Sequence, residues 1–247
     1  MENLVKSIDE KNVNQETQDW YEEYYEEKGQ DRNDLLTNPE VLFQHLAFEV
    51  AIVNALRKAT GLGRTSSKIL DVGCGSGSSM TQLIQLGYSS TCMHGIDIVS
   101  DRIDEALQKY PNIDFVVGDA TSMPYATGEF DLVMESTMFV QLTDEDLSQR
   151  IAREMLRVVK PGGYLLLIDW RYGKPGNKHY AALTPKRVAR LFAEGTQTDV
   201  VCREKGALVP PLGRALSRYL PSMYFLLRGM FPFLVASQAT LLRKRAD

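Results

Sequence analysis

Apolar positions follow two different periods along this chain. Up to about residue 60 they recur at helical spacing, as Leu42, Leu46, Val50, Val53 and Leu56 show. From Lys68 onward, short apolar runs alternate with helical stretches; the runs cover 69–72, 94–98, 113–117, 130–134 and 164–168. This alternation of strands and helices predicts a parallel, doubly wound α/β sheet.

Boundary signals refine this prediction. Asn38 followed by Pro39 predicts a helix that is capped by Asn38 and begins at Pro39. Two further helices are expected over 100–110 and 143–159, a turn over 160–163, and a last strand over 236–243.

Both ends of the chain have unusual patterns. Near the N-terminus, Trp20, Tyr21, Tyr24 and Tyr25 form an aromatic stripe interleaved with glutamates. Near the C-terminus, the segment 216–235 is apolar and is broken by two prolines, with arginines at positions 214, 218 and 228. Charge also differs: residues 1–40 carry 4 − 12 = −8, whereas residues 203–247 carry 8 − 2 = +6.

Composition limits the class of protein. A length of 247 residues fits one α/β domain with appendages. A net charge of −4 argues against a general nucleic-acid binder, which would carry a basic surplus. Cys74, Cys92 and Cys202 are too few and too widely spaced for a disulfide framework or a zinc site. Without a secretory leader or a long apolar span, the chain is expected to be soluble and cytoplasmic.

The strongest chemical signal is a glycine-rich turn between the first strand and its helix. Asp71-Val72-Gly73-Cys74-Gly75-Ser76-Gly77 lets the backbone turn sharply and leaves room for a ligand. Asp97 ends the next strand, where a carboxylate can accept hydrogen bonds from ribose hydroxyls. The glycine spacing differs from the dinucleotide fingerprint, and an acidic residue before the turn suits a positively charged ligand. A sulfonium nucleoside is therefore favoured over a pyrophosphate.

Five motifs in this order resemble class I S-adenosylmethionine-dependent methyltransferases, of the methyltransferase-11 type. The motifs are 69–77, Asp97, Gly118-Asp119-Ala120, Phe130-Asp131-Leu132-Val133-Met134 and the segment 157–163. The resemblance implies a Rossmann-like sheet of seven strands, the last of them antiparallel, with S-adenosyl-L-methionine as cofactor and S-adenosyl-L-homocysteine as product. Further short matches are similar to a subgroup associated with glycan or secondary-metabolite pathways.

Cofactor-binding residues follow from the turn, from the resemblance and from the aromatic stripe. The resemblance implies that Asp97 binds the ribose and that Asp119 faces the adenine amine. Glu135, just after the fourth strand, is expected to contact the cofactor through its backbone. Cation–π contact with the sulfonium is one interpretation of the stripe, and helix packing is the other. The predicted set is Asp71, Gly73, Cys74, Gly75, Gly77, Asp97, Ile98, Asp119, Ala120, Glu135, Tyr21 and Tyr25.

Catalytic candidates are fewer. Methyl transfer depends mainly on orientation, and a hydroxyl acceptor also needs a base. Asp169, just after the fifth strand, and His45, on the helix before the sheet, are the candidate bases, each with a structural role as the rival interpretation. No metal is expected, because Asp169 and Asn177 alone do not form a ligand cluster.

The predicted organisation is a helical cover over the cofactor site, residues 1–60, and a methyltransferase domain, residues 61–247. The apolar insertion, at about 210–235, is interpreted as a lid; contact of 214–235 with a membrane surface and a homodimer interface are the alternatives.

The predicted reaction is methylation of a hydroxyl or amine on a small molecule, most of all a sugar or glycoconjugate. A secondary metabolite is the alternative within this class, and a non-catalytic S-adenosylmethionine sensor is the alternative outside it. A nucleic-acid substrate is disfavoured, because Glu135-Ser136-Thr137-Met138 stands where a base-methylating motif would be.

Overall fold

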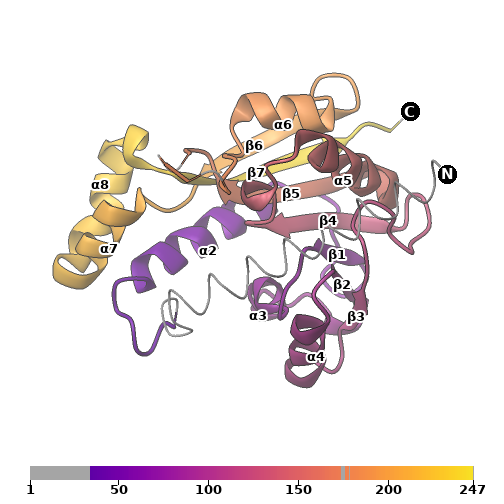
Figure 1. The fold of residues 1–247 in the computed structure, drawn as a ribbon, viewed down its shortest axis with the longest axis horizontal. Coiled ribbons are helices and arrows are strands. Elements are labelled where there is room, and N and C mark those ends of the chain that lie inside the picture. The colour runs from indigo at the N-terminus through magenta and orange to yellow at the C-terminus, as the bar shows by residue number, and fades with distance from the viewer. Residues whose placement is uncertain (1–33, 174–175, 178, 247) are drawn as a thin grey trace.

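The computed structural model describes residues 34–173, 176–177 and 179–246, which form one seven-stranded sheet with helices on both faces (Figure 1). The strands lie in the order β3-β2-β1-β4-β5-β7-β6. β7 is antiparallel to both its neighbours, β5 and β6, whereas β1 to β5 pair in parallel. The strands are β1 (Ile69–Val72), β2 (Met93–Asp97), β3 (Asp114–Val117), β4 (Phe130–Ser136), β5 (Val159–Trp170), β6 (Thr198–Lys205) and β7 (Ser237–Lys244). The expected seven-stranded fold with an antiparallel last strand is confirmed.

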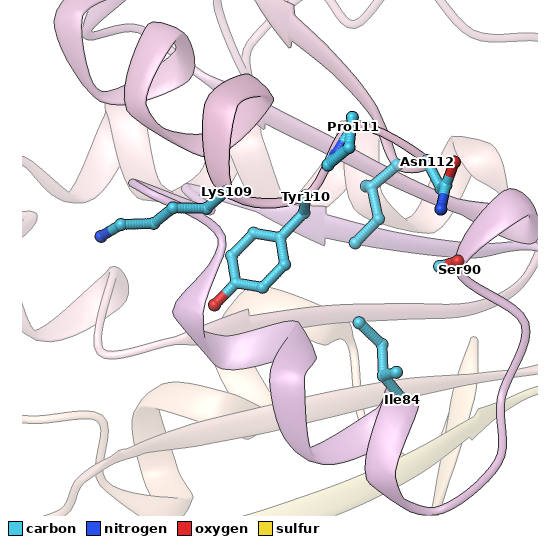
Figure 2. A pocket seen from close by; sticks show the side chains of 7 residues that line it. Ile84, Ser90, Lys109, Tyr110, Pro111 and Asn112 are labelled. Atoms are coloured by element: carbon cyan, nitrogen blue, oxygen red, sulfur yellow. The ribbon is translucent and has the colours of Figure 1, made fainter.

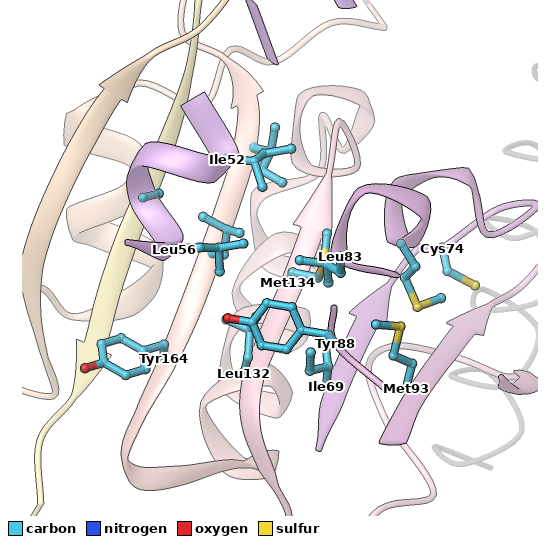
Figure 3. Packing of buried hydrophobic residues seen from close by; sticks show 14 of the residues in the cluster. Ile52, Leu56, Ile69, Cys74, Leu83, Tyr88, Met93, Leu132, Met134 and Tyr164 are labelled. Atoms are coloured by element: carbon cyan, nitrogen blue, oxygen red, sulfur yellow. The ribbon is translucent and has the colours of Figure 1, made fainter. Parts of the chain in front are cut away.

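Two apolar layers hold the helices against the sheet. On one face, buried residues of α2 (Leu42–Leu56), α3 (Thr81–Gln85) and α4 (Ser100–Lys109) pack against the strands. Ile52 and Leu56 of α2 and Leu83 of α3 belong to this layer (Figure 3). On the other face, α5 (Glu145–Val158) and α6 (Pro185–Phe192) cover the sheet. The continuous burial of β1, four consecutive buried residues, follows from being covered on both sides.

Two boundary predictions are wrong for local reasons. α2 begins at Leu42 rather than Pro39, because the side chain of Asn38 accepts from Glu40 N at 3.0 Å and closes a turn ahead of the helix. The expected turn at 160–163 lies within β5. Those four residues stand opposite the single residue Asp131, between the pairs Phe130–Val159 and Leu132–Tyr164, and form an irregularity in the strand.

An apolar segment connects the last two strands at the carboxyl edge of the sheet. Because β6 and β5 are both antiparallel to β7, β6 ends and β7 begins at the edge where β1 to β5 end. Between them lie α7 (Pro210–Tyr219), the short helix η5 (Pro221–Met223), α8 (Tyr224–Met230) and η6 (Pro232–Leu234). α7 and α8 project from one end of the molecule, beside α2 (Figure 1).

Among the described helices, none has the length and apolar character needed to cross a bilayer. The expected helical cover over residues 1–60 lies only partly within the described residues. Its described helix, α2, packs on β5, β6 and β7.

A buried arginine ties α6 to the segment that follows β4. Arg187 is 5% exposed. Its guanidinium donates to five acceptors: the carbonyl oxygens of Phe139, Leu142 and Ala181, Ser148 Oγ and Glu145 Oε2, at 2.7–3.1 Å. Because these acceptors belong to separate loops and to α5, one side chain fixes the path of the chain after β4.

Replacing Arg187 by Met should lower the free energy of unfolding by about 3–5 kcal/mol, because the buried acceptors and the Glu145 carboxylate lose their donor. Chemical denaturation would measure this loss. Arg190→Met is the matched control, since Arg190 also pairs with Glu145, at 2.6 Å, but its side chain is 59% exposed; its cost should stay within about 1 kcal/mol. Equal losses in both variants would contradict the assignment.

Candidate functional site

The glycine turn after β1 adopts a backbone shape that requires glycine. Gly73, Gly75 and Gly77 have φ values of 71°, 52° and 78°. An added Cβ would lie 2.9 Å from Met138 Sδ at Gly73 and 2.9 Å from Phe115 Cζ at Gly77. The amides of Gly73 and Cys74 both donate to Ile96 O, which holds the turn against β2. Hydrogen bonds therefore hold the turn against β2. Because Gly73 and Gly77 have no Cβ, Met138 and Phe115 can pack closely against the turn.

Asp97, the last residue of β2, is bound to this turn. Its Oδ2 accepts from Gly75 N at 2.8 Å and its Oδ1 from Val99 N at 2.9 Å. Each carboxylate oxygen has two lone-pair positions, so both oxygens can accept one more hydrogen bond. Asp97, which the sequence predicts to bind ribose, thus lies beside the glycine turn, and its carboxylate can accept further hydrogen bonds.

The loop after β3 lies next to Asp97. Gly118 N donates to Asp97 O at 2.9 Å. Asp119 Oδ1 accepts from Thr121 N at 2.7 Å, and Ile98, Asp119 and Ala120 are half-buried. Two predicted cofactor loops are therefore linked through the backbone of Asp97.

Asp71 carries an unpartnered polar atom in the interior. Its carboxyl group is fully buried, Oδ2 accepts from the hydroxyl of Ser79, and Oδ1 has no hydrogen-bond partner among the described residues. Burial raises the pKa of Asp71 to about 7; the Ser79 hydrogen bond opposes this rise and the charge of Asp97 adds to it. A buried carboxyl oxygen without a donor is a costly arrangement that a bound donor or cation would relieve.

Glu135 and Asp169 lie at the ends of β4 and β5, and both are buried. Glu135 accepts from Ile168 N at 3.1 Å and from Met138 N at 3.0 Å. Burial, together with the neighbouring Asp169 carboxylate, holds the pKa of Glu135 well above its usual range. Burial likewise raises the pKa of Asp169 to about 7, against the effect of its hydrogen bonds and of Arg187.

The two candidate bases stay predictions, and the structure does not bring them together. Asp169 is 1% exposed, and its two oxygens accept from Val140 N at 2.8 Å and Trp170 N at 2.7 Å. This geometry supports the structural interpretation of Asp169. His45 lies on the exposed side of α2, with its Nε2 3.0 Å from Glu49 Oε1. Three residues further on, Phe48 packs edge-on against Trp170, so α2 crosses the end of β5.

Cys74 is buried within the turn. Burial, with the nearby charges of Asp71 and Asp97, raises the pKa of its thiol, which keeps the sulfur protonated and a poor nucleophile. Its contribution to the site is therefore through its backbone and its small volume. Tyr21 and Tyr25 lie outside the described residues.

Two contributors, Ser79 and Arg187, were missed at the level of sequence, whereas Thr137 lies just after the fourth strand, where residues near the acceptor are expected. Ser79 bonds Asp71, eight residues earlier in the chain. Thr137 has a φ of 59°, a strained value for a β-branched residue, directly after β4. Arg187, on α6, donates to the carbonyl oxygens of Phe139 and Leu142 in the segment that follows β4. Ser79 has a local signal, its place in the helix after the glycine turn, whereas the role of Arg187 depends on tertiary contacts.

These residues fit a nucleoside that carries a positively charged group. The glycine turn is a cradle that a Cβ would fill, Asp97 has free acceptor positions beside it, and Asp71 has an orphaned oxygen. The groups lie at the carboxyl ends of adjacent parallel strands β1 and β2, where ligands of open α/β sheets bind. The opposite edge has a different feature, a shallow pocket before β2 and β3 that is lined by Ile84, Ser90, Tyr110 and neighbours (Figure 2).

Comparison with known proteins agrees with this geometry. Residues 69–163 match the model of a methyltransferase domain family. The chain is 32% identical over 139 residues to 2-methyl-6-phytyl-1,4-hydroquinone methyltransferase of Synechocystis sp., covering 54% of this chain and 42% of that protein. It is 35% identical over 152 residues to an uncharacterized methyltransferase of the same organism, covering 61% of this chain and 68% of that one.

Other relatives have similar names. A demethylmenaquinone methyltransferase of Renibacterium salmoninarum is 31% identical over 105 residues, covering 42% of each protein. Hence the alignments span less than half the length of two of these three curated relatives. Among solved structures, a SAM-dependent methyltransferase of Methanosarcina mazei superposes with a TM-score of 0.56 at 21% identity, covering 75% of this chain and 95% of that one.

The structural likeness shows the fold, and the sequence matches show descent. With the glycine turn, Asp97 and the seven-stranded sheet in place, the chain belongs to the class I S-adenosylmethionine-dependent methyltransferases.

Proposed function

We propose that this protein transfers a methyl group from S-adenosylmethionine to an apolar small molecule. The observation that carries the proposal is the joined geometry of the glycine turn, Asp97 and the unpartnered Asp71 Oδ1 at one edge of the sheet. Each element supplies what a different part of the cofactor needs: a close backbone approach, ribose acceptors and a countercharge.

The cofactor supplies a methyl group on a sulfonium, which is already activated for displacement. The protein chain contributes by positioning the cofactor relative to the acceptor. Asp97 accepts from ribose hydroxyls with its remaining lone pairs, and Asp71 accepts from the amino group of the methionine portion. The backbone of Glu135 and Thr137 shapes the path toward the acceptor. Holding two reactants in line contributes about 7–11 kcal/mol in well-oriented systems.

The acceptor is inferred from the relatives and from the apolar insertion. Two relatives are named for 2-methyl-6-phytyl-1,4-hydroquinone, which carries a phytyl chain, and for demethylmenaquinone. The sugar acceptor expected from the sequence has no support among these names, and a secondary metabolite agrees with them better. Exposed apolar residues between β6 and β7 lie at the same edge as the cofactor site and suit such an acceptor.

Transfer of label tests the proposed reaction. The purified chain, S-adenosylmethionine with a labelled methyl group and a lipid extract of the source organism should give label in the organic phase. Heat-inactivated protein and extract alone are the controls. Label confined to the aqueous phase would contradict the apolar acceptor, and cofactor binding without any transfer would favour the sensor interpretation.

Asp97→Ala should weaken the binding of S-adenosylhomocysteine by at least about tenfold, since hydrogen bonds to a charged group contribute roughly 1.5–3 kcal/mol each. Isothermal titration calorimetry measures the change. Asp101→Ala, which removes an exposed carboxylate four residues later at the start of α4, is the control and should bind normally. Unchanged affinity in a folded Asp97→Ala variant would refute the ribose assignment.

Asp71 makes the binding reaction release a proton. Its pKa of about 7 leaves it mostly protonated at pH 6, and a cation placed beside Oδ1 favours the carboxylate. Binding of S-adenosylhomocysteine at pH 6 should therefore release close to one proton, and at pH 8.5 almost none. Calorimetry in two buffers with different ionisation enthalpies gives this number.

In Asp71→Asn the release from this group is lost, while any contribution from Glu135 and Asp169 persists. Asp199→Asn is the matched control, because Arg245 lowers the pKa of that exposed carboxyl group and it is ionised throughout this range. Equal proton release by the wild type and by Asp71→Asn would exclude Asp71 as the countercharge.

A further inference from the structure

The segment from Gly206 to Ala236 presents large apolar side chains to solvent. Tyr219 is 69% exposed, Leu220 57%, Leu226 52%, Met230 61% and Phe233 64%. Scattered exposed apolar residues are ordinary, but five of this size within fifteen positions form a cluster that marks an interaction surface. We call these five residues the apolar patch.

The inner side of this segment already has its partners. Tyr224 is fully buried; its hydroxyl accepts from Leu208 N at 3.1 Å, and its ring lies 5.8 Å from the ring of Phe43 on α2. Leu226 and Met230, one helical turn apart on α8, share the side that stays exposed. An ordinary surface helix would carry polar residues there. The outward side of α8 is therefore apolar although the helix is already packed.

The positive charge of the segment indicates which kind of partner the apolar patch would bind. Between Gly206 and Ala236 the sequence has three arginines and no aspartate or glutamate, in a chain whose net charge is −4. Arg228 donates to Gly206 O at 2.7 Å and to Lys205 O, which are acceptors without net charge. Burial lowers the pKa of its guanidinium, and the nearby charge of Glu204 opposes this, so the hydrogen-bond partners themselves do not neutralise Arg228. Arg218, by contrast, pairs with Glu40 at 2.9 Å. A second copy of the chain would bring the same positive charges to an isologous contact.

The end of β5 adds a further cation and a rigid attachment. Arg171 donates to Val235 O at 2.7 Å and to Pro232 O at 2.8 Å, again carbonyl groups, and Tyr172 donates its hydroxyl to Phe233 O at 3.0 Å. These hydrogen bonds hold the backbone around Phe233 against the residues that directly follow β5, the strand that ends at the candidate site. Apolar side chains with arginines around them match the boundary between acyl chains and anionic headgroups.

We propose that the apolar patch, with Arg171 and Arg228, binds the surface of an anionic lipid bilayer. The apolar side chains enter the headgroup boundary and the guanidinium groups stay at the level of the phosphates. This mode of binding needs no helix that spans the membrane. The patch uses exposed apolar residues of the same connection that the proposed function assigns to the acceptor, but vesicle binding can be measured without cofactor and without turnover, so the two proposals can fail separately.

Flotation of the full-length chain with lipid vesicles tests the proposal. Binding to vesicles containing phosphatidylglycerol should exceed binding to pure phosphatidylcholine vesicles by roughly tenfold or more and should fall at high salt. The combined variant Leu226→Ser, Met230→Ser, Phe233→Ser should lose roughly tenfold or more of this binding. Leu36→Ser with Leu107→Ser is the control, because these residues are 96% and 43% exposed elsewhere on the molecule; it should bind as the wild type does.

Absence of binding to anionic vesicles by the folded wild type would overturn the proposal, as would equal binding by the triple variant. Circular dichroism and S-adenosylhomocysteine affinity, measured on the same preparations, show that each variant is folded and that its cofactor site is intact. Sedimentation velocity tests the remaining alternative, that a second copy of the chain binds the patch. If the wild type is a dimer that does not bind vesicles, and the triple variant is a monomer, the patch serves self-association and the proposal is wrong.

Discussion

Buried carboxyl groups at the carboxyl edge of the sheet depend on the donors that surround them. Glu135 and Asp169 each accept from two backbone amides, and these hydrogen bonds hold the segments that follow β4 and β5 in one arrangement. Asp71, at the same edge, has only the Ser79 hydroxyl for one oxygen and, among the described residues, no partner for the other. The contrast separates a structural use of buried carboxyl groups from the ligand-binding use that we propose for Asp71.

Arg187 stabilises this edge of the sheet through hydrogen bonds to the backbone that follows β4. Its five hydrogen bonds fix the backbone around Phe139 and Leu142, and Val140, within that stretch, donates to Asp169. A strained Thr137 and a fully buried Glu135 persist because the surrounding contacts determine their positions. The path of the backbone that follows β4 is therefore fixed by a residue on α6, about fifty positions later in the chain.

The sheet and the cofactor side of the site could be predicted because their signals are local. Alternating apolar runs indicated the five parallel strands β1 to β5, and the glycine turn with Asp97 indicated the candidate ligand loops from residues close together in sequence. The roles of Asn38 and of 160–163 were predicted wrongly, because a side-chain turn uses the same residues as a helix cap, and an irregular strand uses the same residues as a turn between a helix and a strand. The structural role of Asp169 at the end of its strand could be anticipated, and one of its two donors is the adjacent amide of Trp170. Arg187 had no local signal, since its acceptors come from separate parts of the chain.

The antiparallel placement of β7 has a consequence for how this chain can change over evolutionary time. Because β6 ends and β7 begins at the same edge, the connection between them can lengthen or shorten while the strand register of the sheet stays as it is. Loop closure depends only weakly on the number of residues in such a connection. The loops around Asp71 and Asp97 belong to the other half of the sheet. Under the proposed function, preference for an acceptor can therefore diverge by insertion or deletion in this one connection, while the residues proposed to bind the methyl donor stay unchanged.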